Sequence, residues 1–201
     1  MTAALVLSRA GIPVTVFERD AGLAEDLRAS TWHPPTLDMM GELGLVEQIL
    51  SDGLVARYTQ HRDRKSGAIA EFDMELLRGE TDHPYRVQYE QFRYTRLLQQ
   101  RLAAFPDCRI VFNARAHSLT QNADQVLLSV ETPNGIEQHR GDYLIGADGS
   151  RSNVRRAANI DFPGLTFPER FYVATTTFDF GKVLDRLCYV NYIADTDEWC
   201  V

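Results

Sequence analysis

The spacing of apolar residues changes from helical to strand-like near the amino end of the chain. Small and aliphatic residues recur at helical intervals over Thr2–Ala10, and Gly11 follows at a position typical of a helix C-cap. Val14–Phe17 is then a short β-branched and aromatic run, which predicts a strand that leads directly into Glu18. A helix and a strand that ends in an acid are typical of the second half of a dinucleotide-binding βαβ unit.

Four more elements are predicted between Thr36 and Phe112. Leu37, Met40 and Leu43 form an apolar stripe at helical spacing, which predicts a helix opened by Thr36 or Asp38. In chain order, the others are a hairpin over Val55–Met74 with a Lys-Ser-Gly turn, a helix over Tyr89–Leu102, and a parallel strand over Arg109–Phe112.

Alternating runs in the second half of the chain predict a set of antiparallel strands. Turn signals separate the first three runs, which are Ala114–Thr120, Gln125–Glu131 and Ile136–His139. These three predict a meander. Two later runs rich in Tyr, Val, Thr and Phe, Arg170–Phe180 and Leu187–Ile193, predict strands that rejoin the sheet begun by the hairpin.

Between the meander and those last runs, a strand is predicted to pass into a helix through an acidic turn. Tyr143–Ala147 is an apolar run of the length found in strands buried on both faces, and Ser150–Asn159 has helical spacing. Asp148 and Gly149 lie between them, at the carboxyl edge of the sheet, where open α/β sheets bind ligands. The simpler alternative is a tight turn with a capping acid.

Composition excludes several classes of protein. The 201 residues are 44% hydrophobic and 24% charged, which is typical of a soluble globular protein of one domain or a domain and a half. The net charge of −7 argues against nucleic-acid binding. No apolar run is long enough to span a membrane. Three cysteines without metal-ligand spacing predict no metal site and favour a reducing, cytoplasmic location.

The residues around the acidic turn resemble a known fingerprint. The segment resembles the Asp-Gly motif of the FAD-dependent aromatic hydroxylases. It has two hydrophobic residues, two small residues, Asp148-Gly149, and then Arg151, Ser152 and Arg155. These are the single-component flavoprotein monooxygenases typified by para-hydroxybenzoate hydroxylase. The sequence departs from the pattern at Tyr143, where a charged residue is common. The resemblance implies that the Asp-Gly turn lies near the FAD pyrophosphate and the NAD(P)H site.

The same resemblance assigns roles to three more positions. Glu18 would bind the adenosine ribose of FAD, Arg28 would lie near its phosphates, and Gln91, at a helix start, would contact its ribityl side. For each there is an ordinary alternative: a solvated strand-end charge, a surface arginine and a common helix N-terminal residue. The proposed cofactor-binding residues are therefore Glu18, Arg28, Gln91, Asp148 and Gly149.

The fold implied is α/β, with a Rossmann-like FAD-binding parallel sheet, an inserted antiparallel meander, and part of a mixed β substrate-binding sheet. The expected domains are a partial FAD-binding domain over residues 1–54 and 88–162, and a partial substrate-binding domain over residues 55–87 and 163–201. The glycine-rich loop normally precedes the ribose-binding acid by about 20 residues, so we expect the chain to lack that loop and its strand. Val14–Phe17 and Arg109–Phe112 should then flank an empty strand position, and FAD retention should be weak.

The implied function is hydroxylation of a small aromatic or polycyclic substrate. In the resembled family NAD(P)H reduces FAD, O₂ forms a flavin C4a-hydroperoxide, and the flavin carries the chemistry, so no catalytic side chain is predicted. Two alternatives remain open. One is a flavoprotein of the same fold that does not hydroxylate, such as a reductase or halogenase, and the other is a non-catalytic truncated remnant. The sequence specifies neither the oligomeric state nor the choice between NADH and NADPH.

Overall fold

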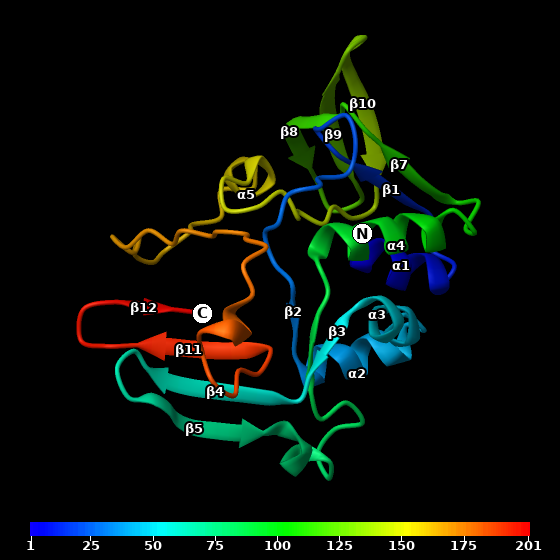
Figure 1. Cartoon of the computed structure of the whole chain (residues 1–201). Coiled ribbons are helices and arrows are strands. Elements are labelled where there is room, and N and C mark those ends of the chain that lie inside the picture. The colour runs from blue at the N-terminus through cyan, green and yellow to red at the C-terminus, as the bar shows by residue number, and fades with distance from the viewer. The chain divides into compact units, whose positions relative to one another are not determined.

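A computed structural model describes residues 1–201 as a mixed α/β chain with one parallel pair of strands, two three-stranded antiparallel sheets and one four-stranded mixed sheet (Figure 1). The chain divides into two compact units. Unit 1 comprises Met1–Glu25 and Thr95–Phe171, and unit 2 comprises Asp26–Tyr94 and Tyr172–Val201. The predicted fold class, a parallel sheet accompanied by a meander and a mixed sheet, is confirmed.

The parallel sheet of unit 1 contains two strands. Helix α1 (Thr2–Arg9) ends before Gly11, which takes a φ of 73°, and the chain turns back into β1 (Val14–Phe17). This strand pairs in parallel with β7 (Cys108–Val111). The helix and both strands were predicted. The expected empty position between the strands was wrong, because β1 and β7 satisfy each other's backbone groups directly, with Val14 beside Cys108 and Phe17 beside Val111.

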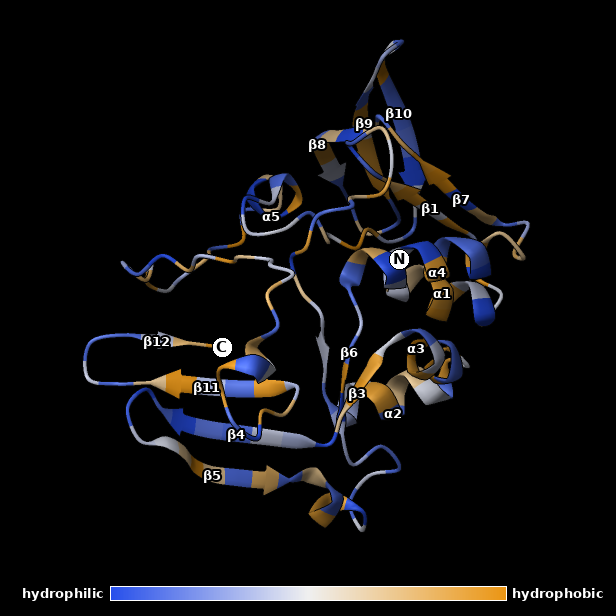
Figure 2. Cartoon of the chain, viewed as in Figure 1, coloured by the Kyte–Doolittle hydropathy of each residue, from blue (hydrophilic) through white to orange (hydrophobic).

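The predicted meander is confirmed as β8 (Arg115–Gln121), β9 (Val126–Thr132) and β10 (Gly135–Gly141), in the order β10-β9-β8. Asn122 builds the first turn, because its Oδ1 accepts hydrogen bonds from the backbone N–H groups of Asp124 and Gln125. Gly135 builds the second, with a φ of 113°. Apolar residues colour β9 in Figure 2, whereas β10 is mostly hydrophilic. The meander therefore buries one strand and leaves its edge polar.

The core of unit 1 lies where the meander meets the parallel pair. Ala114, Leu128 and Val130 form a buried cluster. Phe17 from β1 and Leu144 pack against it, so the end of β1 and the segment leading to Asp148 share one core. This packing fixes the local backbone that carries the predicted cofactor residues of unit 1.

Two predicted features of the Asp-Gly region were wrong. Tyr143–Ala147 forms no strand, and Tyr143 is 93% exposed. A strand needs a neighbour for its backbone groups, and this segment pairs with none of the strands, because β1 pairs only with β7 and β10 only with β9. The following helix, predicted over Ser150–Asn159, is a single short turn, α5 (Asn153–Ala157).

The main sheet of unit 2 has the order β12-β11-β4-β5. Strands β4 (Tyr58–Asp63) and β5 (Gly67–Asp73) form the predicted hairpin, which ends in a 3₁₀ turn, η1 (Met74–Leu77). Strand β11 (Val190–Ala194) pairs in parallel with β4, and the short β12 (Trp199–Cys200) pairs antiparallel with β11. The return of the chain to the hairpin's sheet is confirmed, and the sheet is mixed.

The strand predicted over Arg170–Phe180 was wrong. The segment is irregular and largely exposed, with Tyr172 at 92%, and it ends in a 3₁₀ turn, η2 (Phe180–Lys182). Its β-branched and aromatic residues have β propensity, but propensity forms a strand only where another strand offers partners. The predicted strand over Leu187–Ile193 exists with later bounds, as β11.

The rest of unit 2 is a small sheet, two helices and the start of a third helix. The sheet has the order β2-β6-β3, with β2 (Thr31–Trp32), β6 (Arg86–Gln88) and β3 (Leu54–Ala56). Helix α2 (Pro34–Glu42) begins earlier than predicted, because proline is favoured in the first helical turn. Its stripe residues Leu37 and Met40 are buried as predicted. Gly44, with a φ of 68°, separates α2 from α3 (Val46–Asp52), which was not predicted.

Helix α4 (Gln91–Leu102) carries the chain from the residues of unit 2 into those of unit 1. It begins two residues after the predicted start at Tyr89 and ends at Leu102 as predicted, and Leu98 and Leu102 are buried. None of the helices combines the length and the apolar composition needed to cross a bilayer.

Candidate functional site

The Asp148 carboxylate caps the amino end of α5. Its Oδ2 accepts hydrogen bonds from the backbone N–H groups of Asn153 and Val154, at 2.7 and 3.1 Å, and its Oδ1 accepts one from the Ser152 hydroxyl. Partial burial raises the pKa of this carboxyl, but the hydrogen bonds outweigh burial and hold the pKa below its usual value. The carboxylate is therefore charged and already occupied at neutral pH.

The turn around Asp148 is held by further polar contacts. Gly149 adopts a φ of 80°, a left-handed conformation that glycine enters without strain. Ser152 is the N-cap of α5, and its Oγ accepts from the N–H of Arg155 at 2.9 Å. The Arg155 guanidinium reaches back to donate to the carbonyl of Ser150 at 2.8 Å, and it lies 4.3 Å from the centre of the Phe162 ring. This network gives the turn one conformation.

Asn153 joins the turn to the meander. Its Nδ2 donates to the carbonyl of Ala116 in β8 at 3.0 Å. Asn153 was not predicted as a site residue, and Ser152 was named only as part of the fingerprint. A serine directly before a short helical run is a capping signal that would have identified Ser152. No local pattern could have paired Asn153 with Ala116, which lies 37 residues away.

Glu18 lies half-buried at the carboxyl end of β1. Its N–H donates to Val111 and its carbonyl accepts from Ala114, each at 2.8 Å, so the backbone is fixed by β7 and the residues after it. One side-chain oxygen, Oε1, accepts from the N–H of Asp20 at 3.0 Å. The other oxygen, Oε2, makes no hydrogen bond in the structure. Glu18 thus has an anchored carboxylate with one oxygen left to accept from a ligand hydroxyl, which fits the predicted ribose contact.

Arg28 and Gln91 belong to unit 2 and lie near each other within it. The backbone N–H of Gln91 donates to the carbonyl of Ala29, the residue after Arg28, at 2.8 Å. The next residue, Ser30, accepts from the N–H of Tyr89 at 2.7 Å. Gln91 begins α4 and its side chain is exposed, as a ligand contact requires. The Arg28 guanidinium forms an exposed ion pair with Asp26 at 2.5 Å, so a phosphate would have to compete with that carboxylate.

The five predicted residues therefore fall into two groups. Glu18, Asp148 and Gly149 belong to unit 1, where the end of β1 and the segment before Asp148 pack on one cluster, and Arg28 and Gln91 belong to unit 2. Across residues 1–201, no group of three or more His, Cys, Asp or Glu side chains is arranged to hold a metal ion.

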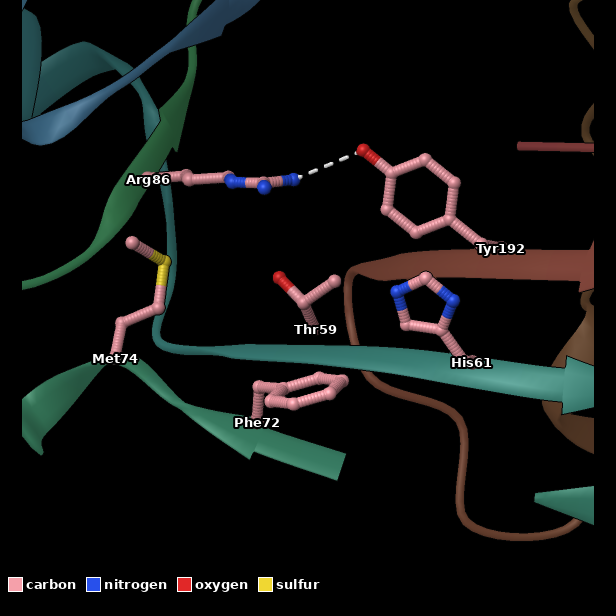
Figure 3. A pocket seen from close by; sticks show the side chains of 6 residues that line it. All are labelled: Thr59, His61, Phe72, Met74, Arg86 and Tyr192. Carbon is pink, nitrogen blue, oxygen red and sulfur yellow. Dashed lines mark hydrogen bonds between the residues drawn. The ribbon is translucent and has the colours of Figure 1, made fainter. Parts of the chain in front are cut away.

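Unit 2 also contains an open cavity of about 420 Å³ that was not predicted from the sequence (Figure 3). It is lined by Thr59, His61, Phe72, Met74, Arg86 and Tyr192. Thr59 and His61 are two apart on β4 and so share a face, which is a signal that alternation could have given. Arg86 and Tyr192 come from strands 106 residues apart, which no spacing pattern relates.

Comparison with protein families matches residues 1–194 to the model described as "FAD binding domain". Among curated proteins, para-nitrophenol 4-monooxygenase of Pseudomonas sp. (strain WBC-3) is 29% identical over 198 residues, covering 98% of this chain and 49% of the relative. The 6-hydroxy-3-succinoylpyridine 3-monooxygenase HspB of Pseudomonas putida (strain DSM 28022 / S16) is 31% identical, covering 90% of this chain and 46% of the relative.

Solved structures give the same result. The crystal structure of p-nitrophenol 4-monooxygenase PnpA from Pseudomonas putida DLL-E4 matches with a TM-score of 0.79 and 28% identity, covering 82% of this chain and 42% of that chain. The OxyS anhydrotetracycline hydroxylase from Streptomyces rimosus matches with a TM-score of 0.71 and 29% identity, covering 81% and 32%. The chain spans about half the length of the curated relatives with which it aligns most fully.

Proposed function

Because this chain belongs to the FAD binding domain family, in the branch of the aromatic hydroxylases, we propose that the protein carrying it is a flavin-dependent monooxygenase. Its substrate would be a small aromatic or polycyclic molecule, its reductant NAD(P)H and its oxidant O₂. The relatives named above are monooxygenases and hydroxylases of such molecules, which supports the proposal. In this proposal, residues 1–54 and 88–162 contribute to FAD binding and residues 55–87 and 163–201 to substrate binding.

The observation that carries the proposal is the carboxylate of Glu18. It lies at the carboxyl end of a parallel strand, with its backbone fixed and Oε2 open to a donor. A ribose hydroxyl is the donor that such an acid binds in dinucleotide-binding βαβ units. Within the same unit, both oxygens of the Asp148 carboxylate already accept hydrogen bonds from the turn and from α5.

Each of the remaining residues has a defined part in the proposal. Gln91 would contact the ribityl side of FAD from the start of α4, and Arg28 would exchange Asp26 for a cofactor phosphate. Asp148 would not contact the cofactor phosphate directly. It would fix the shape of the Gly149 turn, and the turn would shape the approach of NAD(P)H. FAD, when bound, would supply the redox chemistry, so the chain's own residues bind, orient and exclude water.

The proposal is tested by following the oxygen atom. Protein supplied with FAD, NAD(P)H and ¹⁸O₂ should convert a phenolic substrate to a product that carries one ¹⁸O, as mass spectrometry would show. If NAD(P)H is consumed and no product gains ¹⁸O, the protein is a reductase. A halogenated product that forms only when chloride or bromide is added would identify a halogenase. If the protein neither binds FAD nor consumes NAD(P)H, the proposal fails.

A further inference from the structure

The cavity of unit 2 brings one cation, two hydroxyls and several rings to a common space. Arg86 comes from β6, Thr59 and His61 from β4, and Tyr192 from β11, and Figure 3 shows their side chains pointing toward the same opening. The Arg86 Nη1 donates to the Tyr192 hydroxyl at 3.2 Å. Three separate chain segments therefore contribute polar groups to one pocket.

Arg86 has neither the carboxylate partner that most arginines of unit 2 have nor a second hydrogen-bond acceptor. Six of the eight arginines lie within ion-pair distance of a carboxylate: Arg28, Arg57, Arg64, Arg78, Arg93 and Arg186. Arg62 has no carboxylate partner, but it donates to Gln60 and to the carbonyl of Asp185. Arg86 donates only to the neutral Tyr192 hydroxyl. An arginine without an anion in a partly enclosed site is an anion-binding group.

Two buried polar atoms of this cavity also lack hydrogen-bond partners. The Arg86 Nε and the Thr59 Oγ1 are both inaccessible to solvent and unpaired, and Thr59 is only 4% exposed. An unsatisfied buried donor costs free energy, so such groups call for an explanation in a folded protein. Both belong to residues that line the same cavity, so a ligand that accepts from Arg86 and contacts the Thr59 hydroxyl satisfies both once these two side chains turn toward it.

The walls of the cavity suit a flat ring. The His61 and Tyr192 rings are stacked, with centroids 5.0 Å apart and planes 16° apart, and Phe72 meets His61 edge-on at 5.6 Å. Phe72 is 56% exposed, so it has surface to offer to a ligand. Met74 adds a polarisable thioether, which packs well against aromatic rings.

We propose that this cavity binds an aromatic anion, a ring that carries a carboxylate or phenolate oxygen. Arg86 receives the anionic oxygen, Thr59 hydrogen-bonds beside it, and the ring lies against Phe72, Met74 and the stacked pair. This inference rests on the proposed function where it concerns catalysis, because the anion bound in the cavity would be the substrate of the proposed monooxygenase. The binding itself requires neither FAD nor turnover.

The test is calorimetric titration of the protein that carries this chain with two probes of the same shape. 2-Naphthoate has the anionic oxygen, and 2-naphthamide is its neutral counterpart. We expect 2-naphthoate to bind at least tenfold more tightly. Arg86→Gln should remove this preference, and Arg86→Lys should keep most of it because the charge remains. Arg78→Gln is the matched control, since it deletes one exposed arginine that does not line the cavity, and it should change neither affinity.

Several results would overturn the inference. They are equal affinity for the two probes, absence of 2-naphthoate binding at millimolar concentration, and a folded Arg86→Gln protein that still prefers the anion. If Arg86→Gln fails to fold by circular dichroism, Thr59→Val decides: it should weaken 2-naphthoate several-fold, and an unchanged affinity would refute the site. FAD content, measured separately by absorbance, distinguishes the two proposals. Flavin-loaded protein without anion preference sinks only this one, and anion preference without flavin binding sinks only the proposed function.

Discussion

The Asp148 turn of unit 1 and the cavity of unit 2 use their polar groups in opposite ways. Around Asp148 the carboxylate, the Ser152 hydroxyl and the helix N–H groups are all hydrogen-bonded to one another. In the cavity, Arg86 and Thr59 each hold a buried polar atom that has no partner. The fingerprint pointed to the first region, yet the second is the one whose polar groups are incomplete without a ligand. A sequence motif can thus mark a structural turn, while the polar groups that lack hydrogen-bond partners lie elsewhere in the chain.

Removal of the Asp148 carboxylate should have the largest effect on stability of the changes considered for these two regions. Asp148→Ala leaves the first N–H groups of α5 without acceptors, so we expect a loss of about 1.5 kcal/mol in the free energy of unfolding, measured by urea titration. Asp142→Ala, which removes a nearby exposed acid, should have no measurable effect. If the two variants were equally stable, the Asp148 carboxylate would not stabilise the turn and α5.

The same carboxylate predicts a pH dependence. The folded pKa of Asp148 lies below the ordinary aspartate pKa of 3.8, so its contribution to stability is complete above that value and is lost as the pH falls through the folded pKa. The stability difference between the native chain and Asp148→Ala should therefore shrink below about pH 4. Urea titrations at pH 7 and at pH 3 would measure this difference, and a difference that stayed constant would contradict the assignment.

Ser152→Ala probes the hydroxyl of the satisfied region. Ser152 caps α5 through the N–H of Arg155 and also donates to Asp148, and it is 7% exposed. Its loss should cost about 1 kcal/mol of unfolding free energy, the typical value for a helix N-cap. Ser152→Thr should recover most of this, because threonine offers the same hydroxyl at the cap. A threonine variant as unstable as the alanine variant would indicate a packing effect instead.

Glu18 has one oxygen that is hydrogen-bonded and one that is not, as in the two regions compared above. Its removal should therefore lower FAD affinity without changing the fold. Its Oε1 serves the local turn, and its Oε2 is the oxygen assigned to the FAD ribose. Glu18→Ala should weaken FAD about fivefold, which corresponds to about 1 kcal/mol for one lost hydrogen bond. Fluorescence titration of FAD would measure the change. Glu25→Ala, a second acid of the same unit, is the control, and equal FAD affinities in all three proteins would refute the ribose role.

How far the sequence predicted the structure depends on the distance between partners. Helix α1, strand β1 and the meander were predicted because each element is defined by its own spacing or pairs with the next segment along the chain. The runs Tyr143–Ala147 and Arg170–Phe180 have strand-like composition, but they pair with no strand in the structure. The composition of a segment shows that it can form a strand, but it does not show whether a second strand pairs with it.

The candidate site shows the same limit. The resemblance identified Glu18 and Asp148, whose strand-end and turn positions follow from local pattern. It could not show that Ser152 and the α5 N–H groups already occupy the Asp148 carboxylate. The cavity was missed because the pairing of Arg86 with Tyr192 is a product of the fold, and a missing counter-charge can be recognised only when every neighbour is known.

The smallest predicted effect is also the one with the opposite sign. Thr59 Oγ1 is buried and unpaired, so deletion of this hydroxyl removes a desolvation cost and no hydrogen bond. Thr59→Val keeps the β-branched shape that suits β4, and we expect the free energy of unfolding to stay equal or to rise by less than about 1 kcal/mol. Ser152→Ala is the matched hydroxyl deletion in the satisfied region, where the expected change is a loss. Urea titration of both variants therefore compares the two regions directly. A destabilised Thr59→Val protein would mean that the hydroxyl has a partner in solution, and the cavity would then be satisfied in the same way as the Asp148 turn.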